Sequence, residues 1–90
     1  MRTAKEYFEM ANSDKVSEFY LQKIEFAIRD TSLLGITYLT IDEETYEIGN
    51  LFNNESHLNK VKKSLTEHGF EIEEDSYGLT IFWENHADNN

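Results

Sequence analysis

The spacing of apolar side chains predicts a short amphipathic helix at the start of the chain. Four apolar residues follow one another at the helical intervals of three, one and three positions: Ala4, Tyr7, Phe8 and Ala11. Thr3 and Glu6 form the Thr-x-x-Glu pattern of a capping box. We therefore expect this helix to begin after Thr3 and to end near Asn12.

A longer helix should follow over residues 14 to 31. The polar residues 12 to 14 interrupt the first helix and are suited to cap the second one. Six residues form its apolar side: Val16, Phe19, Tyr20, Ile24, Ala27 and Ile28. We expect all six to face the core.

A strand and a loop should come next. Residues 36 to 41 are rich in β-branched and aromatic side chains, which favours a strand that stops at Asp42. Residues 42 to 53 show only a weak pattern, in which residues 46 to 48 resemble a short strand. We interpret the whole segment as a loop.

A third helix should begin after Asn54, a residue suited to cap it. Its apolar side contains Leu58, Val61 and Leu65, and Gly69 occupies the position at which a left-handed residue often terminates a helix. We expect the helix to end at residue 68.

The last third of the chain predicts a β-hairpin. Residues 70 to 73 and 79 to 83 alternate between apolar and polar types on either side of a turn-forming stretch. The element order then predicts an α+β fold, in which three helices pack on one face of a small, mostly antiparallel sheet of three or four strands. Residues 1 to 84 should form this single domain, and residues 85 to 90 a frayed polar tail.

Charge restricts the classes of partner. The 90 residues include 18 acidic and 8 basic side chains, which gives a formal net charge of −10. Residues 1 to 29 are neutral overall, whereas the rest of the chain carries thirteen acidic residues and only Lys60, Lys62 and Lys63. This imbalance opposes direct binding to nucleic acids or anionic membranes. Because the chain has no cysteine and no leader-like segment, we expect it in the cytoplasm.

Eight carboxylates form the candidate binding site: Asp42, Glu43, Glu44, Glu47, Glu71, Glu73, Glu74 and Asp75. Alternate residues of a strand are about 6.6 to 6.8 Å apart. Successive phosphates of a DNA strand have a spacing on the order of this distance. A row of carboxylates along a strand can therefore offer the basic cleft of a DNA-binding protein a charge pattern similar to that of DNA. The alternative is that these side chains only belong to ordinary solvated turns and to an outward strand face, where they serve solubility.

Aromatic residues form a second candidate surface. The alternation in the hairpin turns Phe82 away from the helices, and Tyr38 or Leu39 of the first strand should join it. Large aromatic side chains on a wet sheet face indicate a docking or dimerisation face at Tyr38 and Phe82. Scattered exposed aromatics are also normal on globular proteins, and both interpretations stay open at this point.

Catalytic and metal-binding motifs are lacking. His57 and His68 are too far apart on one helix to share a metal, and we interpret them, with His86 in the tail, as surface residues. The chain has neither a glycine-rich phosphate loop nor a nucleophile elbow. We therefore expect no enzymatic activity, no cofactor and no bound metal.

Two segments of the chain resemble parts of many small proteins of tailed phages. They are LTEHGFEI, from Leu65 to Ile72, and LTIFW, from Leu79 to Trp83, and together they cover about a quarter of the chain. Some phage early proteins of similar size and acidity are anti-restriction or other anti-defence inhibitors that imitate DNA. The resemblance implies a phage-encoded inhibitor in the host cytoplasm, but it transfers no binding residue.

Two hypotheses follow from the sequence. The first is a homodimeric DNA mimic that inhibits a basic host protein such as a restriction nuclease, a CRISPR effector or a nucleoid protein. The second is a small interaction module that docks through its aromatic sheet face, with its acidity serving only solubility. Salt should weaken binding steeply in the first case, whereas truncation of Phe82 or Tyr38 should weaken it in the second.

Overall fold

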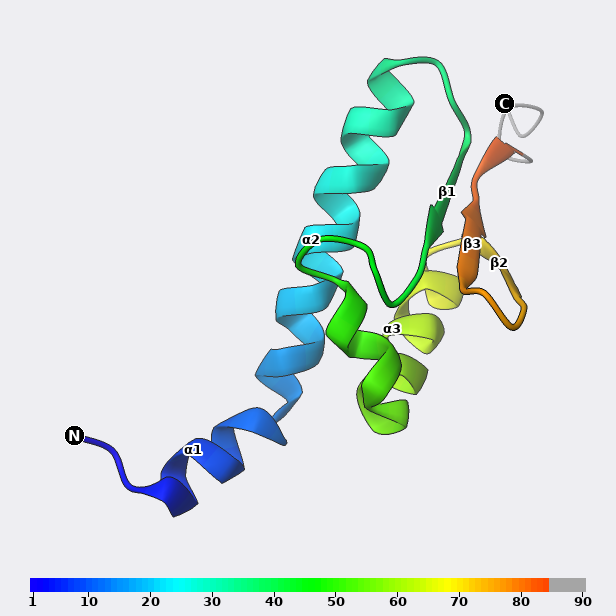
Figure 1. The fold of residues 1–90 in the computed structure, drawn as a ribbon. Coiled ribbons are helices and arrows are strands. Elements are labelled where there is room, and N and C mark those ends of the chain that lie inside the picture. Colours follow the sequence, from blue (N-terminus) through cyan, green and yellow to red (C-terminus); the bar gives the residue numbers. More distant parts are fainter. Residues whose placement is uncertain (85–90) are drawn as a thin grey trace.

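The computed structural model describes residues 1 to 84 of the chain (Figure 1). Its elements, in chain order, are α1 (Ala4–Ala11), α2 (Asp14–Leu33), β1 (Tyr38–Ile41), the 3-10 helix η1 (Gly49–Asn53), α3 (Glu55–Glu67), β2 (Glu71–Glu74) and β3 (Leu79–Phe82). This order confirms the expected α+β fold. The expected frayed tail and His86 lie outside the described residues. Within residues 1 to 84, no helix has the length and apolar character that crossing a membrane requires.

The three strands form one antiparallel sheet in the order β1-β3-β2. Its inner face carries Leu39, Ile81 and Ile72 side by side. Its outer face consists of two cross-strand rows: Tyr38, Phe82 and Glu71 in one, and Thr40, Thr80 and Glu73 in the other. Tyr38 is therefore the residue that joins Phe82 outside, while Leu39 faces inward.

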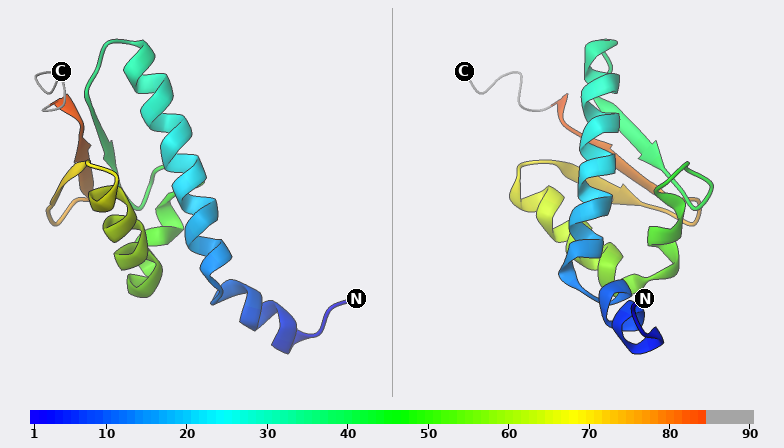
Figure 2. Two further views of the ribbon diagram at one scale, coloured as in Figure 1. Left: turned by 180° about the vertical axis from the view of Figure 1, so that it is seen from behind. Right: turned by 90° about the vertical axis from the view of Figure 1, so that its left-hand side faces the viewer.

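The core lies between this sheet and helices α2 and α3, which cover the same face of it (Figure 2). Eight hydrophobic residues are buried there: Ile24, Ile41, Ile48, Leu51, Val61, Leu65, Leu79 and Ile81. Burying each such side chain stabilises the fold by roughly 1.5 to 3 kcal/mol before the loss of chain entropy is counted. These residues come from α2, α3, β1, β3 and the segment around η1, and the partly buried Ile72 of β2 packs against them.

Local hydrogen bonds explain where α1 and α3 begin and where α3 ends. The capping box between Thr3 and Glu6 is present at the start of α1. At the start of α3, the side chain of Asn54 accepts a hydrogen bond from a backbone N–H in the first turn. At its end, the backbone N–H of Phe70 donates to the carbonyl of Leu65 over 3.0 Å, as in a Schellman motif. These local signals are the reason why the sequence predicts the helix boundaries well.

Helix α1 projects away from the rest of the molecule instead of packing on the sheet (Figure 1). None of its residues is buried. The radius of gyration is 14.6 Å, whereas about 12 Å is expected for a compact domain of this length. Only two of the three helices therefore form the layer over the sheet.

One further expectation, about an individual residue, is wrong. Phe19 was expected to face the core, but it is half exposed on the opposite side of α2. It lies five residues before the buried Ile24, which corresponds to about 140° around a helix. The segment 42 to 53 begins as the expected loop, but its last five residues form η1, and Ile48 and Leu51 are buried.

The junction between α1, α2 and α3 contains a buried histidine, which corrects the expectation that His57 is a surface residue. Its Nδ1 atom lies 3.2 Å from the hydroxyl of Ser17, and its Nε2 atom lies 3.0 Å from the carbonyl oxygen of Ala11. Since a carbonyl only accepts, Nε2 carries the proton and Nδ1 accepts from Ser17 in the neutral ring. The ring thus joins α3 to the end of α1 through Nε2 and to α2 through Nδ1.

An ion pair at the same junction predicts acid sensitivity. A hydrogen bond from Lys60, together with its charge, holds the pKa of the Asp14 carboxyl below its ordinary value of 3.8. A carboxyl group whose pKa is lower in the folded state than in the unfolded state contributes its full stabilisation above the unfolded-state pKa. This contribution is lost as the pH falls through the lowered, folded-state pKa. We expect Asp14→Asn to flatten the fall of the melting temperature below about pH 4. An unchanged acid profile would show that the pair does not contribute to stability.

Candidate functional site

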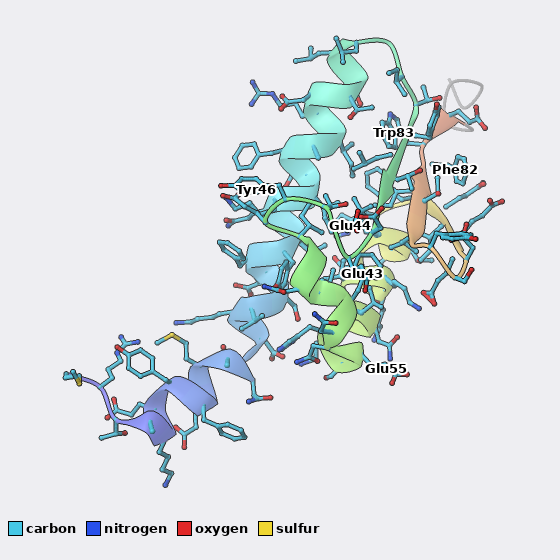
Figure 3. All side chains as sticks on the ribbon, viewed as in Figure 1. Glu43, Glu44, Tyr46, Glu55, Phe82 and Trp83 are labelled. Carbon is cyan, nitrogen blue, oxygen red and sulfur yellow. The ribbon has the colours of Figure 1, made fainter. Side chains whose placement is uncertain are left out.

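The turn after β1 is held by the side chain of Asp42. Its Oδ1 atom accepts hydrogen bonds from the backbone N–H of Glu44 over 2.9 Å and from the hydroxyl of Thr45 over 3.2 Å. The backbone N–H of Asp42 in turn donates to the Thr45 hydroxyl over 2.8 Å. The chain therefore turns sharply here and leaves the side chains of Glu43 and Glu44 exposed (Figure 3).

The tip of the hairpin is held in a similar way by Asp75. Its Oδ1 atom accepts from the backbone N–H groups of Tyr77 and Gly78, over 2.8 and 2.9 Å. Asp and Asn favour such turns because a short side chain can replace a backbone acceptor. The turn leaves the ring of Tyr77 almost fully exposed at the tip.

Two glycines allow the turn after β1 to lie in close backbone contact with its neighbours. A Cβ atom at Gly49 would lie 2.0 Å from the carbonyl oxygen of Glu43, and one at Gly78 would lie 2.3 Å from the carbonyl oxygen of Ile41. Both distances are far below van der Waals contact, so any side chain would push the segments apart. Because neither glycine has a side chain, this turn can pack closely between η1 and the hairpin tip.

The result is a cleft of about 410 Å³ that unites the two acidic segments. Five of the eight predicted carboxylates line it: Asp42, Glu43, Glu44, Glu74 and Asp75. Phe52 and Leu58 supply an apolar wall, and the hairpin tip closes the far side with Ser76, Tyr77 and Gly78. We call this feature the acidic cleft. It joins residues that are more than 30 positions apart in the chain.

The other three predicted carboxylates lie elsewhere. Glu71 and Glu73 occupy the outer face of the sheet, on the opposite side of β2 from Glu74. Glu47 has a positive φ of 63° and pairs with Lys23 of α2 over 2.6 Å. The eight residues therefore form a cleft, an adjacent strand face and one separate ion pair, not a single row.

The lysines of α3 neutralise only part of this charge. Lys62 pairs with Glu74 over 2.8 Å, while Lys60 pairs with Asp14, away from the cleft. Within residues 1 to 84, the side chains of Glu43 and Glu44 have neither a hydrogen bond nor an ion pair. Their charges are thus exposed to solvent and accessible to a partner.

The aromatic pair on the outer sheet face borders Glu71. The ring centroids of Tyr38 and Phe82 are 6.5 Å apart, and their planes are inclined by 39°. Tyr38 is more than half exposed, and Phe82 is partly buried. The sheet therefore presents a small aromatic surface beside carboxylates.

The buried Ser17 and His57 superficially resemble a nucleophile and its base. Both residues are almost inaccessible, and neither lines the acidic cleft. The second ring nitrogen of His57 is bonded to a backbone carbonyl, not to a carboxylate that would orient the ring for catalysis. We interpret this pair as structural. Among residues 1 to 84, no group of three His, Asp or Glu side chains is arranged to hold a metal ion.

Sequence reasoning missed the apolar wall of the cleft and Tyr77. The turn sequence Asp-Ser-Tyr-Gly does predict an exposed side chain at its third position. Phe52 and Leu58 carry no comparable signal, because their place beside the hairpin tip depends on tertiary contacts.

No protein-family model, curated protein or solved structure matches this chain. The functional interpretation therefore depends on the geometry and charge of the site itself.

Proposed function

We propose that this chain is a non-enzymatic acidic protein that binds the basic, nucleic-acid-binding surface of another protein. Its carboxylates would take the places of DNA phosphates. The observation that carries the proposal is the meeting of two distant acidic segments at one cleft, to which the turn after β1 contributes Glu43 and Glu44 and the hairpin tip contributes Asp75. Glu71 and Glu73 extend the negative surface onto the neighbouring strand face.

Electrostatics supports a basic partner. A net charge of −10 on 90 residues attracts cationic surfaces over several ångströms and speeds encounter with a basic cleft. Tyr77 at the edge of the acidic cleft adds a ring that can stack on an arginine guanidinium. DNA-binding surfaces offer lysine and arginine in the required density.

The resemblance to small acidic phage proteins suggests where such a partner is found. We propose a host restriction nuclease, CRISPR effector or nucleoid protein in the bacterial cytoplasm, which the chain would inhibit by occupying the DNA-binding surface. The chain itself would make no direct contact with nucleic acid, since the two are charged alike.

A second candidate function is supported by the aromatic pair on the sheet. Tyr38 and Phe82 lie together on an exposed face, which suits a protein-interaction module that docks there. In that case the acidic residues would serve solubility alone. Truncation of Tyr38 to alanine would then weaken binding more than the removal of charge does.

Charge reversal of the acidic turn, which is the turn after β1 that carries Glu43 and Glu44, tests the leading proposal. The double variant Glu43→Lys and Glu44→Lys should weaken binding to a partner captured from bacterial lysate by about 10 to 100-fold, because it places two positive charges where the partner is basic. The affinity can be measured by biolayer interferometry at low and high salt.

The matched control makes the same change of charge elsewhere. Glu9 and Glu67 lie near the C-terminal ends of α1 and α3, where lysine suits the helix dipole. Glu9→Lys with Glu67→Lys should therefore leave the fold intact and reduce affinity only slightly. Equal losses in both double variants would mean that net charge, and not the acidic cleft, determines binding.

A further inference from the structure

Helix α2 carries a second apolar stripe on the side that faces away from the sheet. Phe19, Phe26 and Leu33 are 50%, 60% and 75% exposed. They follow one another at intervals of seven residues, or nearly two helical turns, so they lie in a row. Ile24, on the opposite side of the same helix, is fully buried. A row with this spacing is the pattern through which helices pack on each other in coiled coils.

The loop after β1 enlarges this stripe. Glu47 pairs with Lys23 over 2.6 Å and so holds the loop against α2. The preceding Tyr46 lies beside α2 on the side away from the sheet and is 85% exposed (Figure 3). The Nζ atom of Lys23 also lies 5.3 Å from the centre of the Phe19 ring. We call Phe19, Phe26, Leu33 and Tyr46 the outer patch.

The accessible surface is large for a monomer. It amounts to 6858 Å², whereas a folded monomer of this mass should expose about 5,500 Å². The excess, roughly 1,400 Å², belongs to the chain as a whole, and both the projecting helix α1 and the outer patch contribute to it. The molecule therefore exposes more surface than a compact monomer of its mass.

We propose that the outer patch is a homodimer interface in which the α2 helices of two copies pack antiparallel across a two-fold axis at Phe26. This arrangement places Phe26 against its own copy and each Phe19 against Leu33 of the other copy. The interface is isologous, as expected for a symmetric dimer.

Charges beside the stripe fit this arrangement. Lys23 and Asp30 lie on the same edge of α2, seven residues apart and on opposite sides of Phe26 in sequence. Antiparallel packing brings Lys23, which pairs with Glu47 of its own copy, close to Asp30 of the other copy, so that each lysine lies near two carboxylates.

The overall distribution of charge also favours the outer side of α2, and not the outer face of the sheet, as the dimer interface. Helix α2 carries three basic and four acidic residues and is almost neutral. A dimer formed through the outer sheet face would instead bring Glu71 and Glu73 of both copies together. Packing through α2 leaves both acidic clefts and both sheet faces directed outward. The inference does not depend on the proposed function, since it concerns only the contact between copies.

Sedimentation equilibrium of the full chain tests the interface. We expect the wild type to be dimeric at about 100 μM, and Phe26→Glu to raise the dimer dissociation constant at least about 100-fold. Tyr38→Glu makes the same chemical change on the sheet face and should leave the dimer intact. Circular dichroism checks that both variants are folded. A monomeric wild type, or a dimer that is lost only in Tyr38→Glu, would overturn the proposal.

A cysteine variant gives a second, independent measurement. The chain contains no cysteine, so Phe26→Cys introduces a single thiol at the two-fold axis. Mild oxidation should convert this variant to a disulfide-linked dimer, while Tyr38→Cys should remain largely monomeric under the same conditions. Equal cross-linking of the two variants would contradict the assigned interface.

Discussion

Gly49→Ala should destabilise the protein by about 3 kcal/mol or more. The added Cβ atom would lie 2.0 Å from the carbonyl oxygen of Glu43 and 2.7 Å from its carbonyl carbon, and both atoms belong to the backbone. Relief requires the acidic turn to move, and overpacking of this kind typically costs about 1 to 3 kcal/mol and at times more. Urea unfolding measures the loss directly. For a small domain it is a large part of the total stability.

Gly35→Ala is the matched control for this prediction. Gly35 has a φ of 82°, but a Cβ atom there would meet nothing within 4 Å. Alanine should therefore cost only the conformational strain of about 1 to 2 kcal/mol. If Gly49→Ala loses no more stability than Gly35→Ala, the acidic turn is not seated against η1 as described.

His57→Ala should destabilise the protein by about 2 to 4 kcal/mol. It removes the hydrogen bonds of a buried ring to Ser17 and to the carbonyl of Ala11, and it leaves a cavity. Because the ring joins the end of α1 to α3, the amides of α1 and of the first turns of α2 should lose protection first. Urea unfolding and amide hydrogen exchange measure the two effects.

His68→Ala controls for the loss of an imidazole on the same helix. His68 is exposed, and its Nδ1 atom donates to the carbonyl of Ser64 over 2.7 Å. We expect its removal to change stability by no more than about 0.5 kcal/mol. Similar losses for both variants would contradict a structural role that is specific to His57.

The secondary structure could be predicted because its signals are local. Thr3 and Glu6 start α1, Asn54 starts α3, and Gly69 adopts its positive φ of 91° where α3 ends. The alternation of residues 79 to 83 also predicted which side chains of β3 face the core. Such signals act within a few residues, so they can be recognised from the amino-acid sequence alone.

The errors concern tertiary environment. Phe19 fits a broad helical stripe by spacing, but it is half exposed, whereas Ile24 of the same helix is fully buried in the core. His57 was assigned to the surface by its residue type, although it precedes Val61 by four positions and Leu65 by eight. This spacing places it on the buried side of α3, so the periodicity of the helix indicates a buried position for His57.

The acidic cleft could be predicted only in part. Both acidic segments are visible in the sequence, and each lies in the turn expected for it. Their meeting depends on the place of β1 beside β3 and on the close contacts at Gly49 and Gly78. Within the described residues, the cleft also takes in Glu74, whose pairing with Lys62 no local pattern indicates.

Competition with duplex DNA tests the central proposal most directly. A partner captured from bacterial lysate by the wild-type chain would be titrated with duplex DNA, and the bound fraction measured at low and at high salt. We expect DNA to displace the chain, high salt to release it, and the variant with Glu43→Lys and Glu44→Lys to capture little of the same partner. A partner that resists salt, has no affinity for DNA and binds the charge-reversed variant equally well would contradict the proposal that the acidic cleft imitates DNA.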